Sequence, residues 1–93
     1  MAIAVLFTPP SMNATQYDEI IKQLENAGAG TPQGRRSHLC FGTGTNLRVL
    51  DVWESQDTFS AFGQTLMPIL QQLGVDPGPG QPEMFEVHNT LPG

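Results

Sequence analysis

Few side chains in this sequence are suited to acid–base or nucleophilic chemistry, since its 93 residues include two histidines, one cysteine and one tyrosine. His38 and Asp51 are the best candidates. A carboxylate that accepts a hydrogen bond from one imidazole nitrogen fixes the tautomer of the ring and raises the basicity of the other nitrogen. We therefore expect His38 to be the general base of any catalysed reaction, with Asp51 orienting it.

This pairing depends on the register of a predicted β-hairpin whose turn is the glycine-rich segment 42–46. If the turn is tight, the antiparallel ladder places His38 opposite Asp51 and Leu39 opposite Leu50. A slip of one residue would move the two polar side chains to opposite faces of the sheet. The alternative interpretation is a half-exposed polar pair without a catalytic role.

Three further residues are candidates for binding a substrate. Trp53 ends a predicted strand, where its ring forms either the wall of a pocket or an ordinary part of the core. Tyr17 begins the apolar stripe of a predicted helix, so its hydroxyl can reach the mouth of a pocket. His88 lies near Glu86 on the last predicted strand, where it belongs either to a site or to the surface or dimer interface.

The single cysteine does not suggest a catalytic dyad or a metal site. Cys40 and His38 are two residues apart on one strand, which separates them by about 6 to 7 Å along it. That distance is too long for a nucleophile and its base, so a buried inert thiol is the better interpretation. The two histidines and the cysteine show no spacing typical of zinc sites. We expect no metal and no cofactor.

Hydrophobic periodicity predicts six elements in the order strand, helix, strand, strand, helix, strand. Capping boxes or N-caps begin the helices at Asn13 and Ser55, and Gly28 and Gly74 end them. Pro68 predicts a kink or break in the second helix. This order predicts a single α+β domain over residues 1–93, a ferredoxin-like βαββαβ sandwich with two helices on one face of an antiparallel four-stranded sheet. The predicted elements are residues 2–7, 14–27, 37–41, 47–53, 56–73 and 83–90.

Composition restricts the partners. Four basic residues against nine acidic ones give a formal charge of −5, which disfavours nucleic acid and anionic membranes. Arg35 and Arg36 form the only adjacent basic pair, which suits a solvated loop or strand end better than an anion site. The N-terminus has no basic region and too short an apolar run for a signal peptide or membrane span. We expect a cytoplasmic protein.

The predicted sheet has more apolar surface than two helices can cover. The strands over 2–7 and 47–53 are apolar on both faces, and an open face of that kind would be a large hydrophobic patch. A second copy of the chain, packed sheet on sheet about a two-fold axis, would bury it. We therefore expect a homodimer formed through the open sheet face.

The junction Val52-Trp53-Glu54-Ser55, leading into a helix with Phe59 and Phe62, resembles the dimeric α/β barrel superfamily, in particular its small antibiotic biosynthesis monooxygenase-like proteins. Element order and length extend the resemblance over nearly the whole chain. The resemblance implies a pocket between helices and sheet for flat hydrophobic compounds such as polyphenols, or in some branches haem. Trp53 matches the tryptophan that lines such pockets, where oxygenation needs neither metal nor flavin.

The chain departs from the family pattern at two places. Phe62 and Gly63 stand where superfamily members often have a histidine, and Val49 stands where oxygenases carry an asparagine. These residues argue against haem degradation and weaken the case for quinol oxygenation. Three functions therefore stay open. The first is a cofactor-independent monooxygenase-like enzyme acting on a small aromatic or polyketide-like compound, and the second is a non-catalytic homodimeric ligand-binding or accessory protein. The third, an isomerase of small lactone-like substrates, fits the fold but has no supporting residue in the sequence.

Overall fold

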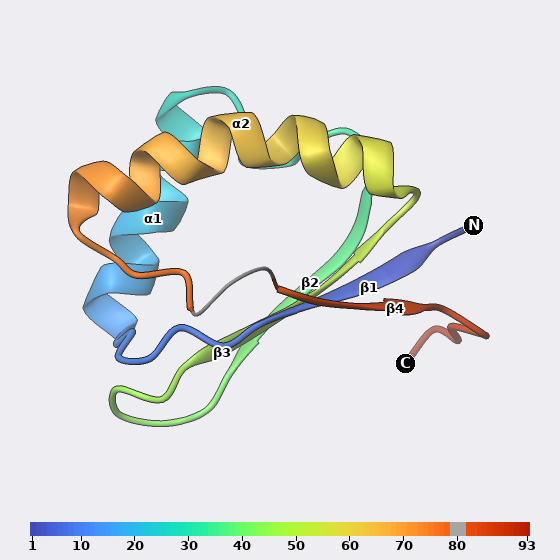
Figure 1. Ribbon diagram of the computed structural model, residues 1–93, viewed down its shortest axis with the longest axis horizontal. Coiled ribbons are helices and arrows are strands. Elements are labelled where there is room, and N and C mark those ends of the chain that lie inside the picture. Colours follow the sequence, from blue (N-terminus) through green and yellow to red (C-terminus); the bar gives the residue numbers. More distant parts are fainter. Residues whose placement is uncertain (79–81) are drawn as a thin grey trace.

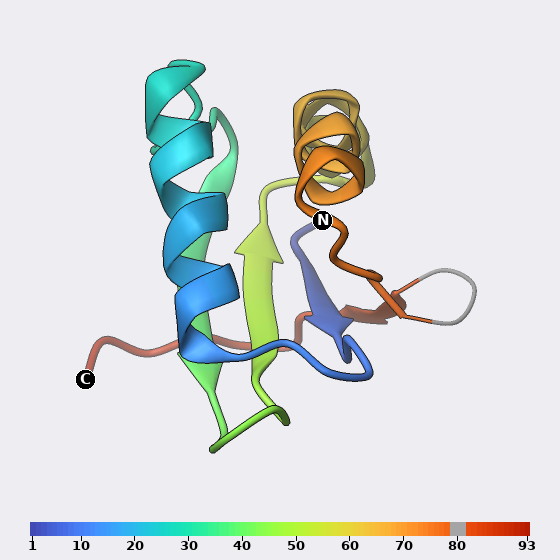
Figure 2. The same ribbon diagram turned by 90° about the vertical axis from the view of Figure 1, so that its left-hand side faces the viewer.

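The computed structural model describes residues 1–78 and 82–93 and has the predicted order of elements. Both helices lie on one side of the sheet, and α2 crosses over it (Figure 1). Turned by 90°, the view shows α1 running in front of β2, with α2 beside its upper part and seen nearly end-on (Figure 2). The elements are β1 (Ile3–Phe7), α1 (Ala14–Asn26), β2 (Arg35–Phe41), β3 (Arg48–Trp53), α2 (Gln56–Leu73) and β4 (Glu83–Glu86).

The sheet is antiparallel with strand order β2-β3-β1-β4, which confirms the predicted ferredoxin-like α+β fold. The hairpin of β2 and β3 has the expected register, with His38 opposite Asp51 and Leu39 opposite Leu50. The predicted last strand is too long, since β4 ends at Glu86 and the residues after it form no regular element. As expected, β4 lies at an edge of the sheet.

Reciprocal capping begins both helices. The Asn13 side chain accepts from the backbone N–H of Gln16 at 2.8 Å, and the Gln16 side chain accepts from the Asn13 N–H at 2.9 Å. Ser55 caps α2 in the same way, and Gly74 ends it in the left-handed conformation. Of the kink or break predicted at Pro68, the break does not occur: α2 continues through Pro68, because packing of the helix against the sheet outweighs the one lost backbone hydrogen bond.

The core lies between the sheet and the helices. Val5 and Trp53 are completely buried on neighbouring strands, and Trp53 packs against Phe59 and Phe62 of α2 with ring centroids 5.7 and 5.0 Å away. Edge-to-face and tilted aromatic contacts of this kind add to the stabilisation from burial alone. Trp53 therefore holds the start of α2 on the sheet.

The opposite face of the sheet carries apolar side chains from every strand. Leu39 and Phe85 are 55% and 52% exposed, although both are large and apolar. The register places further apolar residues beside them on this face. The apolar residues of this open face are Ala4, Leu6, Leu39, Phe41, Leu50, Val52 and Phe85.

No helix among the described residues is long and apolar enough to cross a membrane.

Candidate functional site

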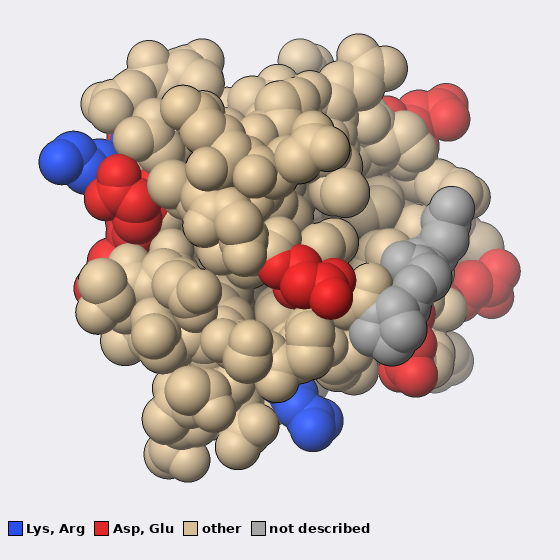
Figure 3. Space-filling model, turned by 60° about the vertical axis from the view of Figure 1, so that its left-hand side comes forward, with Lys and Arg blue, Asp and Glu red and all other residues tan. Residues whose placement is uncertain are grey.

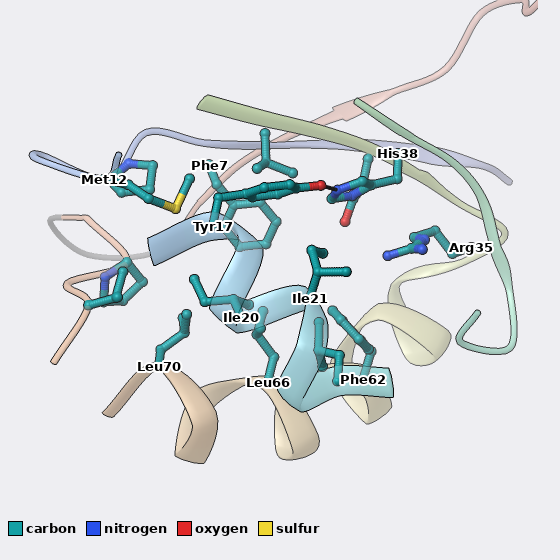
Figure 4. A pocket seen from close by; sticks show the side chains of 16 residues that line it. Phe7, Met12, Tyr17, Ile20, Ile21, Arg35, His38, Phe62, Leu66 and Leu70 are labelled. Atoms are coloured by element: carbon teal, nitrogen blue, oxygen red, sulfur yellow. Dashed lines mark hydrogen bonds and ion pairs between the residues drawn. The ribbon is translucent and has the colours of Figure 1, made fainter. Parts of the chain in front are cut away.

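A partly open cavity lies between the two helices and the helix-facing side of the sheet, and its volume is about 60 Å³. Figure 4 shows Arg35 and His38 at one end and Met12 and Leu70 at the other. Most of the lining is apolar and comes from both helices, with Phe7 of β1 and Val49 of β3 beside them. The cavity therefore has a polar end and an apolar end, which is the common arrangement of small-molecule sites.

Four side chains from α1, β2 and β3 form a continuous hydrogen-bonded chain at the polar end. The Tyr17 hydroxyl lies 2.6 Å from His38 Nε2, and His38 Nδ1 lies 2.5 Å from Asp51 Oδ1. The indole N–H of Trp53 donates to the other carboxylate oxygen of Asp51 at 3.3 Å. The sheet register brings His38 and Asp51 together, and the first turn of α1 brings Tyr17 to them (Figure 4).

The partners of His38 fix its tautomer. An ionised carboxylate only accepts hydrogen bonds, so His38 Nδ1 carries the proton that it donates to Asp51. In the neutral ring, His38 Nε2 then carries a lone pair and accepts the hydrogen of the Tyr17 hydroxyl. The arrangement is that of an oriented base whose basic nitrogen faces a phenol, with a carboxylate behind it.

Burial differs along this chain of groups. The side chain of Asp51 is 3% exposed and that of His38 is 21% exposed. Burial raises the pKa of the Tyr17 phenol, and the nearby Cys40, Asp51 and Asp18 act in the same direction, whereas Arg35 lowers it. Tyr17 therefore stays protonated well into the alkaline range and donates to His38 at neutral pH.

Since Tyr17 is the only tyrosine, phenolate absorbance reports on it alone. We expect the folded protein to titrate above the ordinary value of about 10, and the protein in concentrated urea to titrate near it. The folded-state pKa is the higher one, so this phenol stabilises the fold below the unfolded pKa and the contribution is lost as pH rises through the folded pKa. A folded-state midpoint at or below the unfolded one would contradict the burial of Tyr17.

The other residues predicted for the site lie apart from this chain. Trp53 does not line the cavity, and its link to the site is the hydrogen bond to Asp51. His88 is exposed beyond the end of β4 and does not line the cavity either. Cys40 is half-buried, and burial raises the pKa of its thiol, which suits an unreactive side chain. The described residues contain no cluster of side chains that could hold a metal ion.

Arg35 is a lining residue that sequence reasoning placed in solvent. No pattern in the sequence indicated this position, because regular alternation from His38 would turn Arg36 toward the helices and Arg35 away from them. Figure 3 shows one face that is mostly uncharged, on which the basic side chains lie apart from one another and form no patch. Arg35 is therefore distinguished by its place in the cavity and not by belonging to a basic patch.

No protein-family model and no curated protein matches the chain. Solved structures do match its fold. SnoaB, a cofactor-independent oxygenase from Streptomyces nogalater, is 19% identical with a TM-score of 0.59, covering 99% of this chain and 96% of its own. A protein of unknown function from Nitrosomonas europaea is 18% identical with a TM-score of 0.62, covering 99% and 93%.

A conserved protein from Methanosarcina mazei is 13% identical with a TM-score of 0.59, covering 91% of this chain and 89% of its own. At such identities the similarity concerns the fold and not the chemistry. The chain thus has the ferredoxin-like fold of SnoaB, as its resemblance to the antibiotic biosynthesis monooxygenase-like proteins of the dimeric α/β barrel superfamily predicted.

Proposed function

We propose that this protein is a cofactor-independent monooxygenase-like enzyme acting on a small aromatic compound with a phenolic or enolic hydroxyl. The observation that carries the proposal is the chain from Tyr17 through His38 to Asp51 at the polar end of an apolar cavity. A site of this kind can remove a proton from a weakly acidic hydroxyl and stabilise the charge that remains on the protein. The fold shared with a cofactor-independent oxygenase supports it.

The proton would move in one relay. The hydroxyl of the substrate gives its proton to the Tyr17 oxygen while the Tyr17 proton passes to His38 Nε2, so Tyr17 never becomes a free phenolate. His38 becomes an imidazolium beside the Asp51 carboxylate, which stabilises the added charge. The raised pKa of Tyr17 suits this role, because it disfavours a lasting phenolate and leaves the proton to be passed on.

The substrate anion is then electron-rich enough to react with dioxygen directly. A phenol with a free ring position would lose two hydrogens, gain one oxygen atom at the ring and become a quinone, while the second oxygen atom leaves as water. The electrons come from the substrate and the oxidant is dioxygen. The chain contributes binding, orientation and the proton relay.

The size of the cavity favours a compact substrate. The cavity volume of about 60 Å³ is larger than the roughly 30 Å³ that one water molecule occupies in the liquid. It is smaller than the roughly 150 Å³ of an engineered cavity that binds benzene. A single ring would therefore fill the cavity and extend into its open side, or displace lining side chains such as Met12 by small rotations. A polycyclic compound would need the helices to separate.

The test is oxygen uptake by the purified, metal-free protein with a panel of single-ring phenols and hydroquinones. We expect uptake above the spontaneous rate, a quinone product carrying one atom from labelled dioxygen, and no uptake with the matching methyl ethers. Binding of the same compounds without oxygen uptake would favour the alternative function, a non-catalytic ligand-binding or accessory protein. Val49 and Phe62, which line the cavity with apolar atoms, are the residues that favour that alternative.

We also propose that the working form is a homodimer joined through the open sheet face. Leu39 and Phe85 are more than half exposed there, and the apolar residues of neighbouring strands extend the patch between them. A patch of this composition on a short chain is typical of a protein interface. A second copy about a two-fold axis presents the same apolar face and buries both.

Leu50→Glu is expected to convert the dimer to a monomer, because it places a charge in the middle of the buried face. Light scattering at micromolar concentration measures the mass. The control is Met67→Glu on α2, which replaces another exposed apolar residue, 49% accessible, away from the sheet. A monomeric wild-type chain, or equal effects of both variants, would contradict the interface.

A further inference from the structure

Arg35 owes its place in the cavity to a β-bulge. From Ser37 to Phe41 the pairing with β3 is regular, and His38 and Cys40 face the helices. Continued alternation would turn Arg36 toward the helices and Arg35 away from them. The register shifts between Arg35 and Ser37, so that Arg35 pairs with Trp53 and lines the cavity while Arg36 is exposed. Bulges that re-aim a side chain are frequent beside active sites.

The chain before the bulge is held firmly. Gly34 has φ +87°, and a Cβ there would approach the Thr58 side chain to 2.5 Å, so the loop meets the start of α2 too closely for any other residue. The Glu54 N–H donates to the Gly34 carbonyl at 2.7 Å. The position of Arg35 is thus set by the packing of β2 against the start of α2.

The guanidinium of Arg35 has no ion-pair partner among the described residues, and only one of its nitrogen atoms forms a hydrogen bond there. Its Nη2 donates to the Gly30 carbonyl at 3.1 Å, which anchors one corner of the planar group. Within the described residues, no carboxylate forms an ion pair with it, and the one pair seen in the cavity is His38 with Asp51. Figure 4 shows the group directed into the cavity at the end where His38 lies. A half-buried cation without a counter-ion in an apolar pocket favours an anionic ligand.

We propose that Arg35 selects ligands that bind as oxyanions, pairing with the phenolate or enolate oxygen formed when a proton leaves the ligand. The inference deepens the proposed function and rests on it for the proton relay. The O–H bond of the ligand breaks, the proton is added to the Tyr17–His38 pair, and the electron pair stays on the oxygen facing Arg35. Proton transfer thus creates two ion pairs, His38 with Asp51 and Arg35 with the ligand.

Proton transfer changes the balance of charges at the polar end of the cavity. Before transfer, the polar end holds one cation, Arg35, and one carboxylate, Asp51, which is hydrogen-bonded to the imidazole of His38. After transfer, each positive group in the cavity has a negative partner. The positive charge of Arg35 acts to lower the pKa of a nearby phenol, and this is the direction of its contribution at Tyr17. The same field acts on the hydroxyl of a bound ligand and favours its ionised form.

The test uses 4-nitrophenol, whose phenolate absorbs visible light and whose electron-poor ring does not react with dioxygen. Wild-type protein should bind it and shift its titration to lower pH. Arg35→Gln should weaken phenolate binding about 10- to 100-fold, the usual range for losing a charge-assisted hydrogen bond. Arg35→Lys should retain most of the affinity, since it keeps the charge. Thermal unfolding checks that each variant is folded.

Two controls make the result specific. Arg36→Gln changes the net charge equally at an exposed neighbour and should leave binding unchanged. The methyl ether 4-nitroanisole cannot ionise, so Arg35→Gln should not alter its affinity. Equal loss with Arg36→Gln, equal loss for the ether, or no phenolate binding by the wild-type chain would each overturn the role of Arg35. Because the probe does not react with dioxygen, absence of oxygen uptake by other phenols would reject the oxygenase function and leave this result standing.

Discussion

Replacing Trp53 with alanine is expected to lower the free energy of unfolding by about 3 to 5 kcal/mol, the usual cost of deleting a large buried aromatic ring. The side chain is completely buried and packs on two phenylalanines of α2. A chain of this length has a total stability of roughly 5 to 15 kcal/mol, so the loss would remove a large part of it. Urea unfolding followed by circular dichroism measures the change.

Trp53→Phe separates packing from hydrogen bonding. It keeps an aromatic ring but removes the donor to the second oxygen of Asp51, which leaves a buried carboxylate oxygen without its partner. We expect a loss of about 1 to 3 kcal/mol for this variant. If Trp53→Ala cost no more than Trp53→Phe, the ring would not be the anchor between sheet and α2.

His38→Gln is expected to lower kcat/KM for oxygen uptake by about 10²- to 10⁴-fold, the contribution typical of a general base. The amide can still bond with Tyr17 and Asp51, but it cannot take up the proton of the relay. Most of the loss should lie in kcat, because the cavity walls that bind the ring are unchanged. Initial rates at several substrate concentrations separate kcat from KM.

The chain offers a matched control for this variant. His88→Gln makes the same substitution at an exposed position beyond β4 and outside the cavity, and it should leave the rate unchanged. A rate for His38→Gln within a factor of two or so of the wild type would remove His38 from the mechanism and leave Tyr17 without a proton acceptor.

The sequence predicted more of the sheet than of the site. A tight glycine-rich turn and a period of two decide which residues of a hairpin face each other, so the contact of His38 with Asp51 followed from local rules. The contact of Tyr17 with His38 joins a helix to a sheet over 21 residues of sequence. Its geometry depends on how α1 packs against the sheet, which no local pattern specifies.

Arg35 was missed for a different reason. Alternation along β2 turns it toward solvent, and only the bulge between Arg35 and Ser37 reverses this. Directly before the bulge, Gly34 packs against the start of α2, a long-range contact that no local pattern specifies. Pro68 shows the same limit, since a local rule predicted a kink or a break and the helix continues through this residue.

The reciprocal cap at Asn13 has a consequence for the motions of the site. Tyr17 lies in the first turn of α1, and its backbone N–H bonds to the Asn13 carbonyl at 3.0 Å. The first turn of a helix is the part that frays most readily, and capping is worth about 1 kcal/mol. Opening of that turn would separate Tyr17 from His38 and interrupt the proposed relay. We therefore expect the opening equilibrium of a single helical turn to limit how often the relay is assembled, and amide hydrogen exchange at Tyr17 would measure that equilibrium.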